Sequence, residues 1–156
     1  MRFFICKKYT SGRYVVLDSL GVLHYSYLMR YLGIDYGQKR IGFAVGDEAQ
    51  GIAFPREVIS GDWQKVRHFM EGIIRVEQIG AIVLGLPKML SGKSSSSTEA
   101  VEEFKAKIEK AFLLPIHMVN EVMSTKAVYK GSTKKDRIDA ASAALILQSF
   151  FDSHKK

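Results

Sequence analysis

The chain has 156 residues and one cysteine, Cys6, which excludes an intramolecular disulfide and a zinc site built from several cysteines. Its length predicts one domain with a sizeable core, and no apolar run approaches the roughly 20 residues of a membrane-spanning helix. The formal net charge of +7 favours an anionic partner, of which nucleic acid is the commonest. The cysteine content fits a reducing, cytoplasmic location.

Residues 1–28 differ from the rest of the chain. They carry a short apolar patch, but Asp18 interrupts it and no small-residue cleavage site follows, so a signal peptide is not expected. Met29 then has the pattern of a second start. We interpret residues 1–28 as an extension, either an upstream translation artefact or an ordered appendage, followed by one domain at 29–152 and a tail at 153–156.

The first clear pattern predicts a β-hairpin over residues 31–47, YLGIDYGQKRIGFAVGD. Apolar side chains alternate with glycine, aspartate and alanine on both sides of a polar break at 37–40, which is the period of a strand. A third strand is predicted at 51–60, where Pro55 indicates an edge position or a bulge.

The remaining sequence alternates between helices and strands. Asp62 is expected to cap a helix that ends near Glu77, because apolar residues recur behind it at helical spacing. The other predicted elements are a buried strand at 81–87, a helix at 99–112 that follows Thr98, a strand at 114–122, and a last helix at 138–151 with Ala141, Leu145 and Gln148 in one row.

The order of these elements, three strands and then helices alternating with strands, predicts an α/β fold. Three antiparallel strands continued by parallel strands would form a mixed five-stranded sheet with helices on both faces.

Three carboxylates occupy unusual positions: Asp35 in the first strand, Glu121 at the end of the last strand, and Asp139 in the first turn of the last helix. A carboxylate inside a strand is costly unless it is paired or binds a metal. Ligands tend to bind at the C-terminal ends of parallel strands. Carboxylates that converge there would suit Mg²⁺ or Mn²⁺, and two such ions about 3.5–4 Å apart can promote phosphodiester hydrolysis.

The chain resembles the bacterial YqgF/RuvX family in four segments, GIDYGQKRIGFAVGD, IVLGLPKMLSG, NEVMST and IDAASAALILQSFF, which stand in the family's order. The resemblance extends over about residues 30–151. Members are described as Holliday-junction resolvases or pre-16S rRNA nucleases with an RNase H-like fold. The resemblance implies that Asp35, Glu121 and Asp139 are the catalytic, metal-binding carboxylates. Asn120 and Val122 depart from the family's Asp-Glu-Arg segment, which puts activity in doubt.

The leading hypothesis is therefore a metal-dependent endonuclease that processes the 5′ end of precursor 16S rRNA, as a monomer or a homodimer without a membrane partner. One alternative is a DNase that cuts Holliday junctions or other branched DNA. Another is an inactive nucleic-acid-binding module, which Asn120 and Val122 favour. A third follows from GIDYG, which also resembles the phosphate loop of sugar kinases and actin-like ATPases, although those proteins enclose their nucleotide between two such domains.

Each carboxylate also has a purely structural interpretation. Asp35 could accept hydrogen bonds from amides of the following turn, and Glu121 could be a solvated strand end. Asp139 could be a helix-start carboxylate stabilised by the dipole, with the nearby Asp136 as the N-cap.

Two groups of basic residues are candidates for nucleic-acid binding. Lys39 and Arg40 lie in the predicted hairpin turn, next to Asp35. The second group lies late in the chain and comprises Lys126, Lys130, Lys134, Lys135 and Arg137. Beside a carboxylate site these cations would counter phosphate charge and make binding salt-dependent, whereas the alternative for both groups is ordinary solvated surface. Tyr36 and Trp63 could stack on bases, but core packing is the favoured interpretation for both.

Overall fold

The computed structural model describes residues 4–8, 13–17, 23–27, 29–86, 96–120 and 135–154, and it describes side chains in 29–86, 98–120 and 140–154. Within these residues, no helix is long and apolar enough to cross a membrane.

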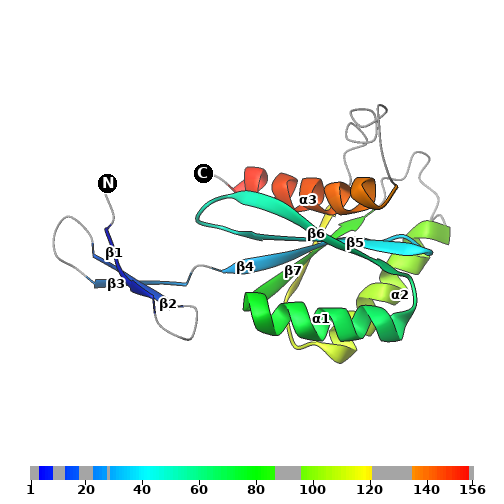
Figure 1. Cartoon of the computed structure of the whole chain (residues 1–156), viewed down its shortest axis with the longest axis horizontal. Helices are drawn as coiled ribbons and strands as arrows, with labels where there is room; N and C mark the ends of the chain where they lie inside the picture. The colour runs from blue at the N-terminus through cyan, green and yellow to red at the C-terminus, as the bar shows by residue number, and fades with distance from the viewer. Residues whose placement is uncertain are drawn as a thin grey trace.

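A five-stranded mixed sheet forms the centre of the domain (Figure 1). Its strands lie in the order β6-β5-β4-β7-β8, so the first strand of the predicted hairpin is the middle strand. β5 pairs antiparallel with β4 and β6, whereas β7 and β8 continue the sheet parallel to β4. The strands are β4 (Arg30–Asp35), β5 (Arg40–Asp47), β6 (Ile52–Ser60), β7 (Ile79–Leu86) and β8 (Ile116–Asn120). This arrangement confirms the predicted fold class.

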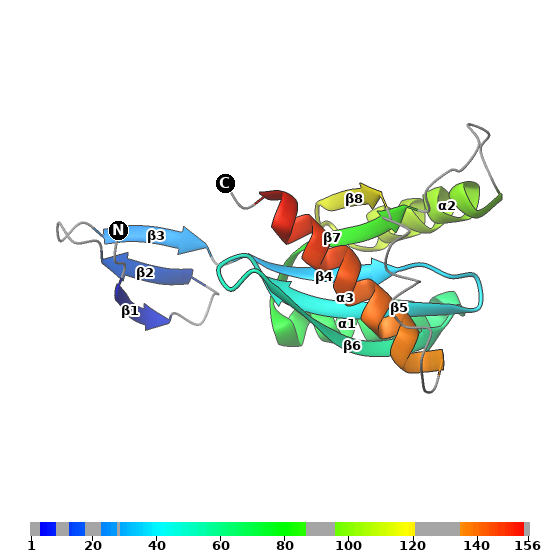
Figure 2. The same cartoon turned by 90° about the horizontal axis from the view of Figure 1, so that it is seen from above.

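Three helices cover the sheet, α1 (Trp63–Glu77) and α2 (Ser96–Ala111) on one face and α3 (Lys135–His154) on the other (Figures 1 and 2). Strand side chains alternate between these two faces. Leu32 and Ile34 of β4 therefore belong to the core with α1 and α2, and Tyr31 belongs to the core with α3.

Two local predictions about the edge of the sheet are confirmed. The Asp62 side chain caps α1 by accepting a hydrogen bond from the Lys65 N–H at 3.0 Å. Pro55 lies on the outermost strand, and the pairing register with β5 shifts beside it, between Gly42 and Ala44. Proline has no N–H to donate, so it is tolerated at an edge or at a bulge, and an N-cap carboxylate satisfies a free N–H of the first helical turn.

Both later helices begin earlier than predicted. α2 starts at Ser96, so Thr98 lies inside it, and α3 starts at Lys135, so Asp136 is a helical residue and the prediction that it is the N-cap was wrong. Asp139 is the fifth residue of α3 and lies beyond the first turn. The first residues of each helix are polar and carry no apolar period, which is why the pattern located the starts too late.

A second sheet was not predicted from the sequence. β1 (Phe4–Lys8), β2 (Arg13–Leu17) and β3 (Leu23–Tyr27) form a separate three-stranded antiparallel sheet, and none of its strands pairs with the larger sheet. The segments FICKK and RYVVL do not alternate strictly between apolar and polar side chains, so the sequence showed only an apolar patch there.

Candidate functional site

One edge of the sheet collects the C-terminal ends of the three parallel strands. Asp35 is the last residue of β4, and Ile34 beside it pairs with Leu84 of β7. Farther out, Leu86 pairs with Asn120, and these are the last residues of β7 and β8. Figure 2 shows the arrows of the three strands pointing the same way. The end of β4, which bears Asp35, and the ends of β7 and β8 therefore lie at one edge of the sheet.

The position of α3 follows from its contacts with β4. Tyr31 lies against the rings of Phe150 and Phe151, with centroids 5.2 and 5.6 Å away. Two residues farther along β4, a Cβ on Gly33 would stand 2.8 Å from Leu147 Cβ and 3.0 Å from the Ala143 carbonyl oxygen. Helix and strand therefore run antiparallel, and each step toward the end of β4 leads to an earlier turn of α3.

The same progression indicates what lies opposite Asp35. Asp35 comes two residues after Gly33, and the turn of α3 that precedes Ala143 contains residue 139. Two strand residues cover about 6.6 Å and one helical turn covers about 5.4 Å, so the two steps match. Figures 1 and 2 agree, because α3 begins at the end of the sheet where β4 ends.

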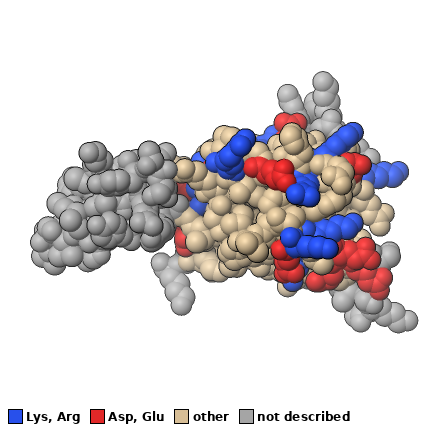
Figure 3. Space-filling model, turned by 90° about the horizontal axis from the view of Figure 1, so that it is seen from below, with Lys and Arg blue, Asp and Glu red and all other residues tan. Residues whose placement is uncertain are grey.

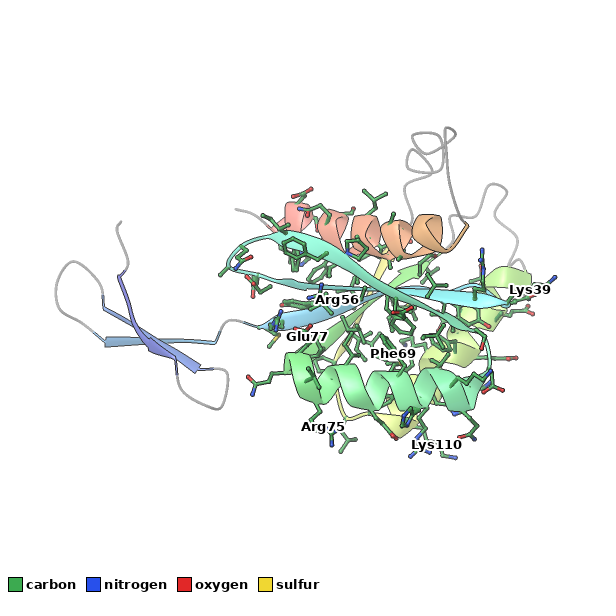
Figure 4. All side chains as sticks on the ribbon, in the orientation of Figure 1. Lys39, Arg56, Phe69, Arg75, Glu77 and Lys110 are labelled. Atoms are coloured by element: carbon green, nitrogen blue, oxygen red, sulfur yellow. The ribbon has the colours of Figure 1, made fainter. Side chains whose placement is uncertain are left out.

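The turn between β4 and β5 is held in place by two glycines. The Gly61 N–H donates to the Lys39 carbonyl at 2.9 Å, and a Cβ on Gly61 would collide with the Gln38 carbonyl. A Cβ on Gly37 would lie 2.6 Å from the Arg40 carbonyl oxygen. The start of α1 thus anchors this turn, and Figure 4 shows Lys39 at the end of the molecule where α3 begins. The role of Gly61 was not predicted from the sequence, although its place directly before the capping Asp62 was a usable signal.

The structure describes only part of the predicted site. Asp35 is partly exposed, Lys39 is exposed and Arg40 is partly buried, all at this edge. Asp139, Lys135 and Arg137 are backbone positions of α3 whose side chains lie outside the description. Glu121, Lys126, Lys130 and Lys134 lie outside the described residues altogether. Among the side chains that are described, no three His, Cys, Asp or Glu residues cluster to hold a metal.

The aromatic candidates pack into the core, as favoured. Tyr36 lies against Phe104 with ring centroids 4.6 Å apart, and Trp63 meets the same ring edge-on at 6.0 Å. Both belong to the apolar cluster under α1 and α2. Their contacts with Phe104 are therefore those of side chains at the border of the core.

The helices on that face carry a balanced charge. α1 and α2 together contain six Lys or Arg and six Asp or Glu residues. Some of them pair along the helix, as Arg67 does with Glu71 at 2.9 Å and Lys105 with Glu109 at 3.3 Å. Figure 3 shows blue and red side chains intermingled. The net positive charge of the chain therefore resides outside these two helices.

Comparison with known proteins places this geometry in a family. The family described as "RuvX: Holliday junction resolvase" matches residues 29–153. The chain belongs to the RuvX family. The match covers every element of the larger sheet and the three helices that pack on it.

Close relatives carry the name "Putative pre-16S rRNA nuclease". The protein from Geobacillus thermodenitrificans is 38% identical over 138 residues, which are 81% of this chain and 100% of that protein. The one from Koribacter versatilis is 38% identical over 135 residues, 79% of this chain and 86% of that protein. The one from Maridesulfovibrio salexigens is 35% identical over 132 residues, 78% of this chain and 97% of that protein.

Among solved structures, RuvC from T. thermophilus in complex with a Holliday junction substrate is similar with a TM-score of 0.53. The similarity covers 80% of this chain and 94% of RuvC at 14% sequence identity. Identity this low supports the shared fold, an RNase H-like α/β sheet, and nothing finer.

Proposed function

We propose that this chain is a divalent-metal-dependent endonuclease that processes the 5′ end of precursor 16S rRNA. Its membership of the RuvX family and the name that its relatives carry support the reaction and the substrate. The observation that carries the proposal is the antiparallel register of α3 on β4, in which the turn containing Asp139 comes opposite the end of β4 that bears Asp35.

Alternation along the strands supports a shared side of the sheet for Asp35 and Glu121. Asp35 follows Tyr31 and Gly33, both of which face α3, in the same row of β4. On β8, His117 contacts the Phe150 ring at 5.1 Å and Val119 packs in the α3 core, so Glu121 is next in that row. Continuing the two-residue period by one step, we expect Glu121 on the α3 side of the sheet.

The chemistry of the donor set fits Mg²⁺ or Mn²⁺. Both are hard cations that prefer carboxylate oxygen and water, and Asp35, Glu121 and Asp139 would hold them with carboxylates from three different elements. When bound, such ions would lower the pKa of a coordinated water and neutralise charge on the scissile phosphate.

The basic residues near this edge would bind the RNA backbone. Lys39 and Arg40 lie on a turn that Gly61 fixes beside Asp35, so their charges would be near the phosphate to be cut. The basic residues at 126–137 would add to this positive charge. The two helices on the other face would not, because their positive and negative side chains are equal in number. Each phosphate contact makes binding weaker at higher salt.

The proposal is tested by cleavage of a 5′-extended 16S precursor beside a four-way DNA junction, with Mg²⁺, with Mn²⁺ and with chelator. We expect Asp35→Asn to lower the cleavage rate by more than about 10²-fold, because changes that only orient a metal ligand already cost 10–100-fold. Asp47→Asn is the matched control, since Asp47 ends β5 at the opposite end of the sheet and accepts from the Gln50 N–H at 2.7 Å.

The other outcomes discriminate the alternatives. Cleavage of the junction but not of the RNA would favour the DNase. Salt-sensitive RNA binding without cleavage under any metal would favour the inactive binding module. Equal cleavage by wild type and Asp35→Asn would remove Asp35 from the site.

A further inference from the structure

Gln148 connects α3 to the edge of the sheet by directional bonds. Its Oε1 accepts from the Ala53 N–H at 3.2 Å, and its Nε2 donates to the Gly51 carbonyl at 2.8 Å. The same Nε2 also donates to Asp152 Oδ1 at 3.0 Å. Gly51 and Ala53 flank Ile52, the first residue of β6. The side-chain amide thus uses the two backbone groups that a residue of a parallel neighbouring strand would use.

The apolar contacts of α3 do not fix its position along its own axis equally well. The helix packs against small residues of the sheet, Ala44 and Ala81, and lies close to the backbone at Gly33 and Gly46. The same face also holds larger side chains, with Phe150 and Phe151 against Tyr31, but apolar burial is non-directional and fixes the axial position of the helix less sharply than a directional bond does. A hydrogen bond tolerates only a few tenths of an ångström.

We infer that Gln148 is a positioning residue that sets the axial position of α3 and thereby the spacing between Asp35 and Asp139. The inference rests on the proposed function, in which these two carboxylates share the metal site. Asp139 lies nine residues before Gln148 on one continuous helix, so a slide at one end is transmitted to the other. A slide by one residue is about 1.5 Å, and a misplacement of about 1 Å can cost 10²-fold in rate.

The first test compares Gln148→Leu with Gln64→Leu, the same substitution on the exposed side of α1. For Gln148→Leu we expect kcat on the RNA to fall by about 10²-fold with KM unchanged, because the misplacement affects the reacting geometry and leaves the backbone-binding cations in place. Binding of Mn²⁺ alone, followed by the loss of the free-ion EPR signal, should weaken by about 10-fold. Gln64→Leu should match wild type in all three.

The position of the helix is measured directly with two spin labels, at Gln38 in the β4–β5 turn and at Ser153 near the end of α3, in a Cys6→Ser background. Both sites are exposed and lie toward opposite ends of α3. In Gln148→Leu the distance between the labels should shift by about 1.5 Å, the rise of one helical residue, or its distribution should broaden, because the two bonds from Gln148 to the backbone of Gly51 and Ala53 are lost.

A second variant covers the possibility that Gln148→Leu does not fold. Asp152→Ala removes an exposed carboxylate that accepts from the Gln148 amide and leaves the amide itself in place. It should change the distance and the Mn²⁺ affinity in the same direction and by less. An unchanged distance with unchanged Mn²⁺ affinity, in whichever of the two variants folds, overturns the inference.

The two proposals fail separately. If wild type cleaves no precursor RNA, the proposed function fails, while the label distance and Mn²⁺ binding still decide the role of Gln148. If wild type cleaves and Gln148→Leu loses kcat without a change in distance, Gln148 acts by another route and the inference is wrong.

Discussion

The two faces of the sheet are packed in different ways. Under α1 and α2 the core consists of large side chains, with Phe43, Met70 and Ile108 fully buried. Under α3 the strands contribute smaller side chains, Ala44, Ala81 and Val83, and aromatic rings gather toward the start of β4, where Tyr31 meets Phe150. The first face holds its helices at the distance that large side chains require, and the second lets its helix approach the strand backbone.

The two faces therefore have different roles: one contributes mainly to the free energy of unfolding and the other mainly to the position of α3. Large interdigitating side chains remove most apolar surface from water, so the α1 and α2 face should dominate the free energy of unfolding. A helix against glycine and alanine removes less surface, but it lies closer to the strand backbone and is bonded through Gln148 to the backbone of Gly51 and Ala53. The end of β4 and the first turns of α3 meet on this second face, where a small displacement changes the distance between the two chain segments.

Met70→Ala, on the face covered by α1 and α2, should lower the free energy of unfolding more than the other substitutions. Met70 is fully buried between α1 and the sheet, and truncating such a residue costs about 2–5 kcal/mol of unfolding free energy. Because the cavity lies on the face away from α3, kcat per folded molecule should be unchanged. Urea unfolding gives the first quantity and active-site titration with RNA the second. A kcat that falls in step with stability would contradict the separation of the two faces.

Gly33→Ala is the corresponding change on the second face. The new Cβ would lie 2.8 Å from Leu147 Cβ and 3.0 Å from a backbone carbonyl of α3, so the helix must move. Overpacking of this kind costs about 1–3 kcal/mol, less than Met70→Ala, yet kcat should fall by about 10²-fold.

Gly72→Ala is the matched control for Gly33→Ala. A Cβ on Gly72 of α1 meets nothing within 4 Å, and alanine in a helix interior is favoured over glycine by about 0.5–1 kcal/mol. It should therefore raise stability and leave kcat alone. Equal kcat in the two glycine variants would show that the distance of α3 from β4 does not govern the reaction.

The same contrast explains what the sequence could predict. The hairpin, the capped α1 and the buried β7 follow from periods of two and 3.6 residues in large apolar side chains, and these elements were predicted to within a few residues. The position of Asp35 at the end of the middle strand could likewise be inferred from the hairpin and the order of strands.

What could not be predicted depends on small and polar residues. The row Ala141, Leu145 and Gln148 lies on a partly exposed side of α3, while Ala140, Ala143 and Leu147 form the buried one. Alanine fits either side of a helix, so its spacing does not reveal which side packs. The bonds of Gln148 join residues 95 and 97 positions apart, and no local pattern contains such a contact.

Tyr31→Phe gives the smallest effect and reports on the far end of the α3 face. The buried Tyr31 hydroxyl donates to Glu48 Oε2 at 3.5 Å, a long hydrogen bond whose loss should cost less than about 1 kcal/mol near neutral pH.

Burial raises the pKa of this hydroxyl, and the negative charge of Glu48 and the hydrogen bond to it raise the pKa further. A tyrosine in the unfolded chain loses its proton near pH 10, while Tyr31 in the folded protein still holds it. The unfolded state thus binds fewer protons above that pH, and stability falls as pH rises.

Urea unfolding between pH 8 and about 11 should show that the free energy of unfolding falls less steeply with pH for Tyr31→Phe than for wild type. Glu48→Gln removes the charge while keeping an acceptor, and it should give a slope between the two. Parallel slopes for wild type and Tyr31→Phe would mean that this end of the α3 face is open to water, contrary to the packing of Tyr31 against Phe150.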